Sequence, residues 1–274
     1  MVVTLEPLDR ATKQRLVDEA GPWHHSIDLG DGVVTPGGKT LHHHHDELIR
    51  LHLPPLADKS VLDVGAWDGY YTFMAEGAAA SRVVALDHYA WSIDFKRATE
   101  YILRQQADGQ PIRAFHTVPE LWDPVHLPGK SGFDLAHRAL NSRAEVVVDD
   151  FMTMDVAALG TFEVVLFLGV IYHLEEPLRA LRRLRQVTKS LAVIESEAVL
   201  LPGQASRPLW QFVDATELND DPSNWWVPTA EGLRAMCLAA GFPKAEIVSG
   251  PPEYLRQSGQ AANYRAVVHA HGDR

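Results

Sequence analysis

The clearest candidate for a ligand-binding site in this sequence is a pair of glycines that follows an apolar segment. Residues 61–64 read Val-Leu-Asp-Val, and Gly65 and Gly69 follow with three residues between them. The run is typical of a parallel strand covered on both faces, and the glycines permit a tight turn with close backbone approach to a ligand. The segment therefore predicts a strand, a turn and a helix that bind a nucleotide-like molecule.

The residues around these glycines indicate which class of ligand the turn binds. A dinucleotide fingerprint needs glycines where the chain has Trp67 and Tyr70, and neither glycine has the lysine and hydroxyl of a phosphate-cradling loop. Asp63, Asp68 and Asp87 favour instead a ligand that carries hydroxyls and positive charge. S-adenosylmethionine has an ammonium, a sulfonium and a ribose. The segment resembles the first motif of class I S-adenosylmethionine-dependent methyltransferases, and an ordinary strand-turn-helix is the alternative.

From residue 56 onward, apolar segments alternate with helical ones, which is typical of α/β proteins with a doubly wound parallel sheet. We expect a Rossmann-like, seven-stranded methyltransferase sheet with strands at 60–64, 82–86, 144–148, 163–167, 190–195, 245–248 and 264–270, and a helix at 177–187.

Several polar or flexible residues fall where these strands end. Asp87 lies 22 positions beyond Gly65, close to the ~20 at which an acidic side chain reaches ribose hydroxyls. Asp150 and Gly169 follow two further strands. Because ligands of open sheets bind outside the carboxyl ends of strands, we expect these four residues to meet in one crevice.

The segments outside the predicted sheet are expected to form an N-terminal cap and to cover the substrate. Residues 1–55 carry two short amphipathic helices, at 9–20 and 42–51, and predict an N-terminal helical cap on a methyltransferase domain at 56–274. The long stretch 91–143, between strands two and three, predicts a helical insertion over the substrate. Residues 201–224 are expected to be irregular, before a helix that ends at Ala240.

Composition limits the partners. The net charge of −11 and pI near 5.6 disfavour nucleic acid as a partner and favour a small-molecule acceptor. The single cysteine, Cys237, lies in an apolar helical run and predicts a core residue in a cytoplasmic protein. No membrane segment or signal peptide is expected, and homo-oligomer formation stays open.

Further motifs carry a closer resemblance. They are Gly21-Pro22-Trp23, Ile27-Asp28, Asp63-Val64-Gly65 with Asp68-Gly69-Tyr70-Tyr71, Leu168-Gly169-Val170-Ile171-Tyr172-His173, Val227-Pro228 and Gly241-Phe242. Together they resemble the bacterial tRNA wobble-uridine carboxymethyltransferase family over roughly residues 21 to 270.

The resemblance implies a site for S-adenosylmethionine. The turn at Gly65 would hold the methionine end, Asp87 would bind ribose, and Asp150 and Phe151 would border adenine. Leu168 and Tyr172 would line the cofactor and transfer site. The expected cofactor-binding set is completed by Trp23, Asp63, Ala66, Trp67, Gly69 and His88.

Three departures separate the chain from that family. His24-His25, Leu29-Gly30-Asp31-Gly32 and Ala261-Ala262 stand where the family has basic residues that recognise RNA and a carboxylated cofactor. We therefore expect ordinary S-adenosylmethionine and methyl transfer, and tRNA wobble-uridine alkylation is the alternative.

The first candidate for a catalytic residue is His173. A hydroxyl acceptor needs a base, and the unperturbed histidine pKa of ~6.5 suits work at neutral pH. A structural role as a helix cap or loop hydrogen-bond partner is the alternative. Tyr172 is the second catalytic candidate and more simply a lining residue, because a phenol pKa of ~10 is high for a base. His24 and His25 are weaker candidates.

Two groups of residues resemble metal sites, and neither is predicted to bind a metal. The tract His42 to His45 could place His42 and His45 on one helix face, although no further ligand closes a site. Asp149 and Asp150 could bind magnesium with Glu195 or Glu197, but strand-end carboxylates fit cofactor binding equally well. The sequence thus predicts a cytoplasmic methyltransferase that modifies an oxygen or nitrogen of a small molecule in natural product biosynthesis.

Overall fold

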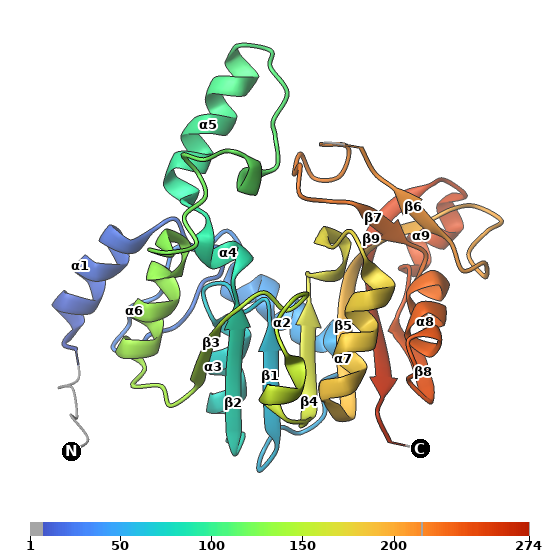
Figure 1. Ribbon diagram of the computed structural model, residues 1–274, viewed down its shortest axis with the longest axis horizontal. Helices are drawn as coiled ribbons and strands as arrows, with labels where there is room; N and C mark the ends of the chain where they lie inside the picture. Colours follow the sequence, from blue (N-terminus) through green and yellow to red (C-terminus); the bar gives the residue numbers. More distant parts are fainter. Residues whose placement is uncertain (1–7, 215, 274) are drawn as a thin grey trace.

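The computed structural model describes residues 8–214 and 216–273 and is built on one seven-stranded sheet with the order β3-β2-β1-β4-β5-β9-β8 (Figure 1). The first five strands run parallel, and β9 pairs antiparallel with both β5 and β8. The strands are β1 Ser60–Val64, β2 Arg82–Asp87, β3 Glu145–Val148, β4 Phe162–Leu168, β5 Thr188–Leu200, β8 Lys244–Ser249 and β9 Ala262–His271. The predicted α/β class and seven-stranded sheet are confirmed.

Helices cover both faces of this sheet. One face packs on α7 Pro177–Val187 and α8 Ala230–Ala239, and the other on α2 Leu41–Leu51 and α3 Tyr70–Gly77. Alternate residues of β1 show why: Leu62 and Val64 belong to the first apolar cluster and Val61 to the second. The near-continuous apolar runs in the sequence reflect this burial on both sides.

The N-terminal helices lie against different parts of the sheet domain. Helix α1, Arg10–Ala20, packs on α6, Ser131–Ala139, whereas α2 contacts β8. The division into a cap at 1–55 and a domain at 56–274 stays a prediction. Among the described residues, the helices are too short and too polar to cross a membrane.

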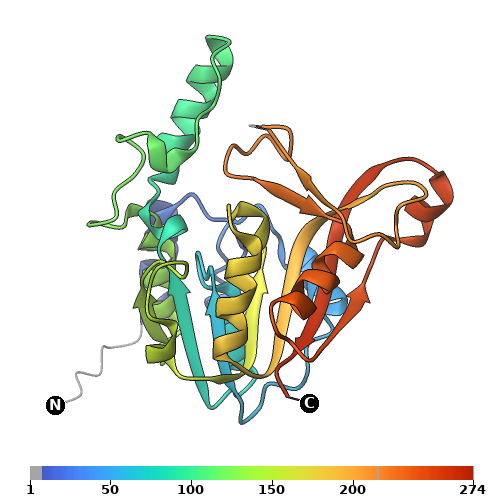
Figure 2. The ribbon, with the colours of Figure 1, turned by 45° about the vertical axis from the view of Figure 1, so that its right-hand side comes forward.

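Residues 91–143 form helices, as expected for an insertion. They include α5 Phe95–Ala107, which follows the short α4 Tyr89–Ser92, the 3-10 turns η1 Phe115–Thr117 and η2 Pro128–Lys130, and α6. Figures 1 and 2 show α5 projecting beyond the carboxyl ends of the parallel strands. On the other side of this edge stands a hairpin of β6 Trp210–Phe212 and β7 Trp226–Pro228.

The structure corrects the sequence expectation after residue 195. Strand β5 continues to Leu200, because its second half pairs with β9 from Ser196↔Ala266 to Leu200↔Ala262. The segment 201–224, expected to be irregular, contains β6, and a short helix α9, Glu253–Ser258, precedes β9. Two other connections are 3-10 turns, η3 Val156–Leu159 and η4 Ile171–His173.

Candidate functional site

A cavity of about 620 Å³ opens at the carboxyl ends of the parallel strands. Gly65, Asp87, Asp150 and Gly169, which follow or end four different strands, all line it. The expectation that these residues meet in one crevice is confirmed. Both projecting segments contribute walls, with Phe115 and Trp122 among the residues from the insertion and Asp221, Ser223 and Trp225 from the segment before β7.

The turn after β1 requires glycine at its first position. Gly65 has φ +80°, and a Cβ there would lie 2.6 Å from Cγ2 of Val170. The N–H groups of Gly65 and Ala66 both donate to the carbonyl of Leu86, at 2.8 and 3.2 Å. The loop is thus bound to β2 and passes close to the residues after β4, which leaves no room for a side chain.

Trp67 occupies the place where a dinucleotide-binding loop would have its second glycine. Its backbone has φ +48°, and its ring stacks between His24 and Phe95 at centroid distances of 3.9 and 5.1 Å. Its carbonyl accepts the indole N–H of Trp91 at 2.6 Å. A bulky ring held between two others thus stands where a dinucleotide-binding loop would have a glycine.

Asp87 connects the ends of β1 and β2. Its carboxylate accepts the backbone N–H groups of Trp67 at 2.9 Å and Ala90 at 3.0 Å. Burial raises the pKa of Asp87 to about 6. A carboxylate has about four acceptor sites, so Asp87 keeps capacity for hydroxyl donors of a ligand in the cavity.

Asp150 and Phe151, which follow β3, also line the cavity. Asp150 accepts from the N–H of Met152 at 2.8 Å and from the hydroxyl of Thr153 at 3.1 Å. The carbonyl of Phe151 accepts from Nε of Arg183 on α7 at 2.6 Å. These bonds fix a loop of polar edges and one aromatic ring, the chemistry that adenine binding needs.

The other two aspartates of the glycine motif face elsewhere. Asp63 is buried and accepts the hydroxyl of Thr72 at 2.6 Å, and burial raises its pKa to about 7. Asp68 accepts the N–H groups of His24 and His25, and its other carboxylate oxygen makes a buried hydrogen bond with Nδ1 of the His25 ring. They support the turn from behind, and Asp87 is the member of the three that lines the cavity.

The predicted site residues therefore divide into two groups. Those that line the cavity are Gly65, Trp67, Asp87, His88, Asp150, Phe151 and His173. Those that lie behind its walls are Trp23, Asp63, Ala66, Gly69, Leu168 and Tyr172. Trp23, for example, packs on Gly132 and donates its indole N–H to Val17 at 3.1 Å.

Tyr172 belongs to a charged cluster at the end of β4. Its hydroxyl accepts from Nη1 of Arg265 at 3.1 Å, and burial raises its pKa to about 12. Arg265 makes a two-pronged ion pair with Glu195 and a further one with Glu197 at 2.9 Å. The two glutamates considered as magnesium ligands are thus held by a guanidinium.

His173 lines the cavity and makes a contact that the sequence did not reveal. Its Nδ1 lies 2.8 Å from Oγ of Ser223, and that hydroxyl donates to Oδ1 of Asp221 at 2.6 Å. Burial lowers the pKa of the His173 ring. Ser223 and Asp221 lie about fifty positions from His173, so only the fold brings the three together.

The histidines of the tract on α2 lie on different faces of the helix. His42 and His45 are exposed, whereas His44 is buried and stacks on Tyr70 at a centroid distance of 3.6 Å. No group of three metal-ligating side chains is found among residues 8–214 and 216–273. His24 and His25 pack on the glycine motif, and burial lowers the pKa of His24 to about 3.

Comparisons with known proteins agree with this geometry. No protein-family model matches the chain. Solved structures similar to it include the N-terminal domain of EvdMO1 with SAH bound, at 15% identity, with a TM-score of 0.61 over 97% of this chain and 98% of that one. The whole EvdMO1 structure matches with a TM-score of 0.51 and 17% identity, over 96% of this chain and 48% of that one.

The strand order with an antiparallel β9, the cavity at the carboxyl ends and this similarity decide the fold. The chain has the class I S-adenosylmethionine-dependent methyltransferase fold.

Curated relatives of this methyltransferase-fold chain bear the name predicted from its motifs. The tRNA U34 carboxymethyltransferase of Methylococcus capsulatus is 24% identical over 73% of this chain. That of Pseudomonas aeruginosa strain LESB58 is 28% identical over 70% of it. The matches cover 49% and 48% of these relatives, so the chain spans about half their length. The sequence resemblance is confirmed.

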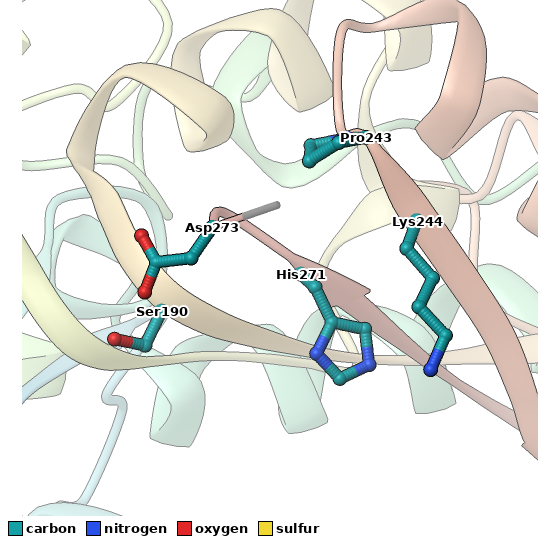
Figure 3. Close-up of a pocket in the computed structure, with 5 residues that line it drawn as sticks. All are labelled: Ser190, Pro243, Lys244, His271 and Asp273. Carbon is teal, nitrogen blue, oxygen red and sulfur yellow. The ribbon is translucent and has the colours of Figure 1, made fainter.

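A second hollow lies at the opposite end of the methyltransferase sheet, near the start of β5 and the end of β9. Figure 3 shows Ser190 and Asp273 on one side of it, Lys244 on the other and His271 between them. Lys244 and His271 are both paired with Glu246, at 2.9 and 3.1 Å. Its distance from the glycine turn and its neutralised charges separate it from the candidate site.

Proposed function

We propose that the chain is an S-adenosylmethionine-dependent methyltransferase that methylates an oxygen or nitrogen of a small molecule. The observation that carries the proposal is the cavity in which the Gly65 turn, Asp87 and Asp150 meet. The similar EvdMO1 domain, solved with SAH bound, supports the same cofactor.

The residues present fit this cofactor. The Gly65 turn brings backbone to the cavity with no side chain in the way, which suits the methionine end. Asp87 keeps acceptor sites for ribose hydroxyls, and Asp150 and Phe151 offer polar and apolar edges for adenine. S-adenosylmethionine supplies an activated methyl group, so the chain mainly has to align the acceptor with it and exclude water.

His173 is our candidate base, because it lines the cavity and its lowered pKa keeps the ring neutral at neutral pH. Tyr172 lies behind the cavity wall, where its hydroxyl accepts from Arg265. Because a hydroxyl with a pKa of about 12 is a poor base, we propose that Tyr172 supports the site and does not take a proton.

A small acceptor fits the walls of the cavity. Aromatic side chains from both projecting segments, Phe115, Trp122 and Trp225, surround a space of about 620 Å³, within the range typical of small-molecule sites. One EvdMO1 domain structure was obtained in the presence of SAH and D-fucose, so sugar hydroxyls belong among the acceptors to be tested. A cytoplasmic location, natural product biosynthesis and a homo-oligomer remain predictions.

The names of the relatives favour a second candidate, alkylation of the tRNA wobble uridine. It requires a basic face, which we expected on the insertion if RNA binds there. Residues 91–143 contain seven lysines and arginines and six aspartates and glutamates. Arg97, Arg104 and Lys130 are paired with Asp94, Glu120 and Asp134, so these cations are locally neutralised.

A labelled methyl donor distinguishes the candidates. The protein is incubated with methyl-labelled S-adenosylmethionine, or with its carboxylated analogue labelled on the transferred carbon. The acceptors are either a panel of phenols, sugars and amines or unmodified tRNA. We expect label in a small molecule and weak tRNA binding at physiological salt. Label in tRNA, with binding that weakens steeply as salt rises, would establish the second candidate instead.

A further inference from the structure

The hydrogen bonds behind His173 determine which of its nitrogens carries the proton. The hydroxyl of Ser223 is 2.6 Å from Oδ1 of Asp221 and 2.8 Å from Nδ1 of His173. A serine hydroxyl has one proton, and an ionised carboxylate can only accept. The serine proton therefore goes to Asp221, and Oγ is left to accept a proton from Nδ1.

Because Nδ1 is bound to Ser223, Nε2 is the remaining ring nitrogen of a residue that lines the cavity. With Nδ1 protonated and the ring neutral, Nε2 carries a lone pair. Unconstrained imidazole has two tautomers, and the carboxylate and hydroxyl behind His173 select one of them. The three residues, named here the His173 relay, all belong to the cavity lining.

The backbone holds the relay in place. The N–H of Ser223 donates to the same Oδ1 of Asp221 at 2.9 Å, which closes a turn. The N–H of Trp225 donates to the carbonyl of Tyr172 at 2.8 Å, so the segment is bound to the residue next to His173. Asn224 is buried and its side chain donates to the carbonyl of Leu218 at 2.8 Å. The serine is thus positioned by its surroundings before any ligand binds.

We propose that Ser223 and Asp221 are positioning residues that direct the Nε2 lone pair of His173 toward the cavity, and that the acceptor is a hydroxyl compound. This rests on the proposed methyltransferase function. An alcohol or phenol becomes a strong nucleophile when its proton is removed, whereas a neutral amine already has a lone pair. A base with a preset lone pair is therefore useful chiefly for oxygen.

The proton and electron balance is simple. The acceptor oxygen forms a bond to the methyl carbon of a sulfonium donor, and the electron pair of the broken carbon–sulfur bond remains on sulfur. Nε2 of His173 takes the hydroxyl proton. The ring becomes an imidazolium whose Nδ1–H still donates to Ser223, with the Asp221 carboxylate behind it.

The tautomer can be observed without an acceptor. Nitrogen-15 NMR of protein labelled in its histidine rings distinguishes a protonated Nδ1 from a protonated Nε2, and His173→Asn identifies the signals of this ring. We expect Nε2 of His173 to be unprotonated in the free protein at neutral pH. A proton on Nε2 in the wild type would overturn the proposal.

Variants test the two supporting residues. Ser223→Ala removes the acceptor of the Nδ1 proton and should move that proton to Nε2, whereas Ser223→Thr should keep the wild-type tautomer. Ser196→Ala is a matched control, because Ser196 is buried and donates to the Glu197 carbonyl at 2.7 Å. An unchanged tautomer in Ser223→Ala would overturn the role of the serine.

The role of Asp221 is tested by the pH at which the His173 ring is half protonated, measured by the same NMR signals. The charges that act on His173 are Asp221, Glu197 and Arg265, and the two carboxylates favour the imidazolium. Asp221→Asn should lower the midpoint by about one pH unit. A midpoint that stays or rises would contradict the relay.

Binding of S-adenosylhomocysteine, measured in parallel by calorimetry, separates this inference from the proposed function. Absence of binding would count against the cofactor site and leave the tautomer result standing. Methylation of an amine that survives in His173→Asn, with no transfer to alcohols or phenols by the wild type, would overturn the hydroxyl assignment.

Discussion

The backbone N–H of Trp67 donates to the carboxylate of Asp87 at 2.9 Å, so the end of β2 fixes the loop that follows β1. The bond places a ribose-binding candidate and the glycine turn in one rigid unit. Because Asp87 also accepts from Ala90, the carboxylate is oriented from two sides. A ligand that donates hydroxyls to Asp87 meets an acceptor that needs no rearrangement.

Replacement of Asp87 by asparagine should weaken S-adenosylhomocysteine binding by about 10- to 100-fold, because hydrogen bonds to a charged group are each worth about 1.5–3 kcal/mol. Titration calorimetry measures the change. Asp155→Asn is the control, since Asp155 caps the 3-10 turn at 156–159 and should leave the affinity unchanged. Equal affinities for wild type and Asp87→Asn would show that Asp87 does not hold the ribose.

Cofactor affinity should depend on pH through Asp87. Burial raises its pKa to about 6 in the folded protein, so the carboxylate is ionised above that pH and protonated below it. Ribose hydroxyls donate to the ionised form, and affinity should therefore fall as the pH decreases through 6. The fall should be smaller in Asp87→Asn. An affinity that is constant from about pH 5 to 8 in the wild type would argue against this linkage.

Gly65→Ala should disturb both stability and binding. A residue other than glycine at φ +80° is strained, and its Cβ would overlap Val170, so we expect a loss of about 1–3 kcal/mol in the free energy of unfolding. Urea denaturation checks the stability and calorimetry the affinity. Gly77→Ala is the comparison, because a Cβ there meets nothing within 4 Å. Equal losses in the two variants would contradict the requirement for glycine at position 65.

The ion pair of Arg265 with Glu195 should contribute to stability. Glu195→Gln leaves the partly buried guanidinium of Arg265 with Glu197 as its one remaining carboxylate partner among those described, and we expect a loss of about 2–3 kcal/mol, below the usual cost of a fully broken buried pair. Thermal unfolding measures it. Glu197→Gln should cost less, because it removes a single contact from Arg265. The reverse order would be inconsistent with the two-pronged geometry.

His173→Asn should slow methyl transfer to a hydroxyl acceptor by about 10²- to 10⁴-fold, the range typical of a general base. The affinity for S-adenosylhomocysteine should change far less, since the ring acts on the acceptor. Initial rates and calorimetry on the same preparation check both. A variant that keeps the wild-type rate would reduce His173 to a structural residue.

Much of the fold followed from local patterns. The strands at 60–64 and 82–86 are mostly apolar because both faces of the sheet are covered. The helix at 177–187 begins at Pro177, where the pattern predicts it. The full length of β5 was not predictable. Its second half contains Glu197, a polar residue that the sequence cannot show to be paired with Arg265 across the sheet.

Some of the site residues could likewise be predicted from the sequence and others could not. Gly65, Asp87 and Asp150 were found because each follows a recognisable strand, whose carboxyl end must meet the others. The sequence indicates Asp68 as one of three aspartates that face the ligand, but the fold places it against His25, a residue 43 positions away. Ser223 is not predictable from the sequence, because a serine in a segment without a motif gains its contact with His173 only through the tertiary structure.

We propose above that the Gly65 turn and Asp87 bind S-adenosylmethionine. Titration calorimetry of the wild-type protein with S-adenosylhomocysteine at about pH 8, where Asp87 is ionised, tests it most directly. We predict saturable binding of one molecule per chain, with a large loss of affinity in Asp87→Asn. An absence of binding by the folded wild-type protein would contradict the claim.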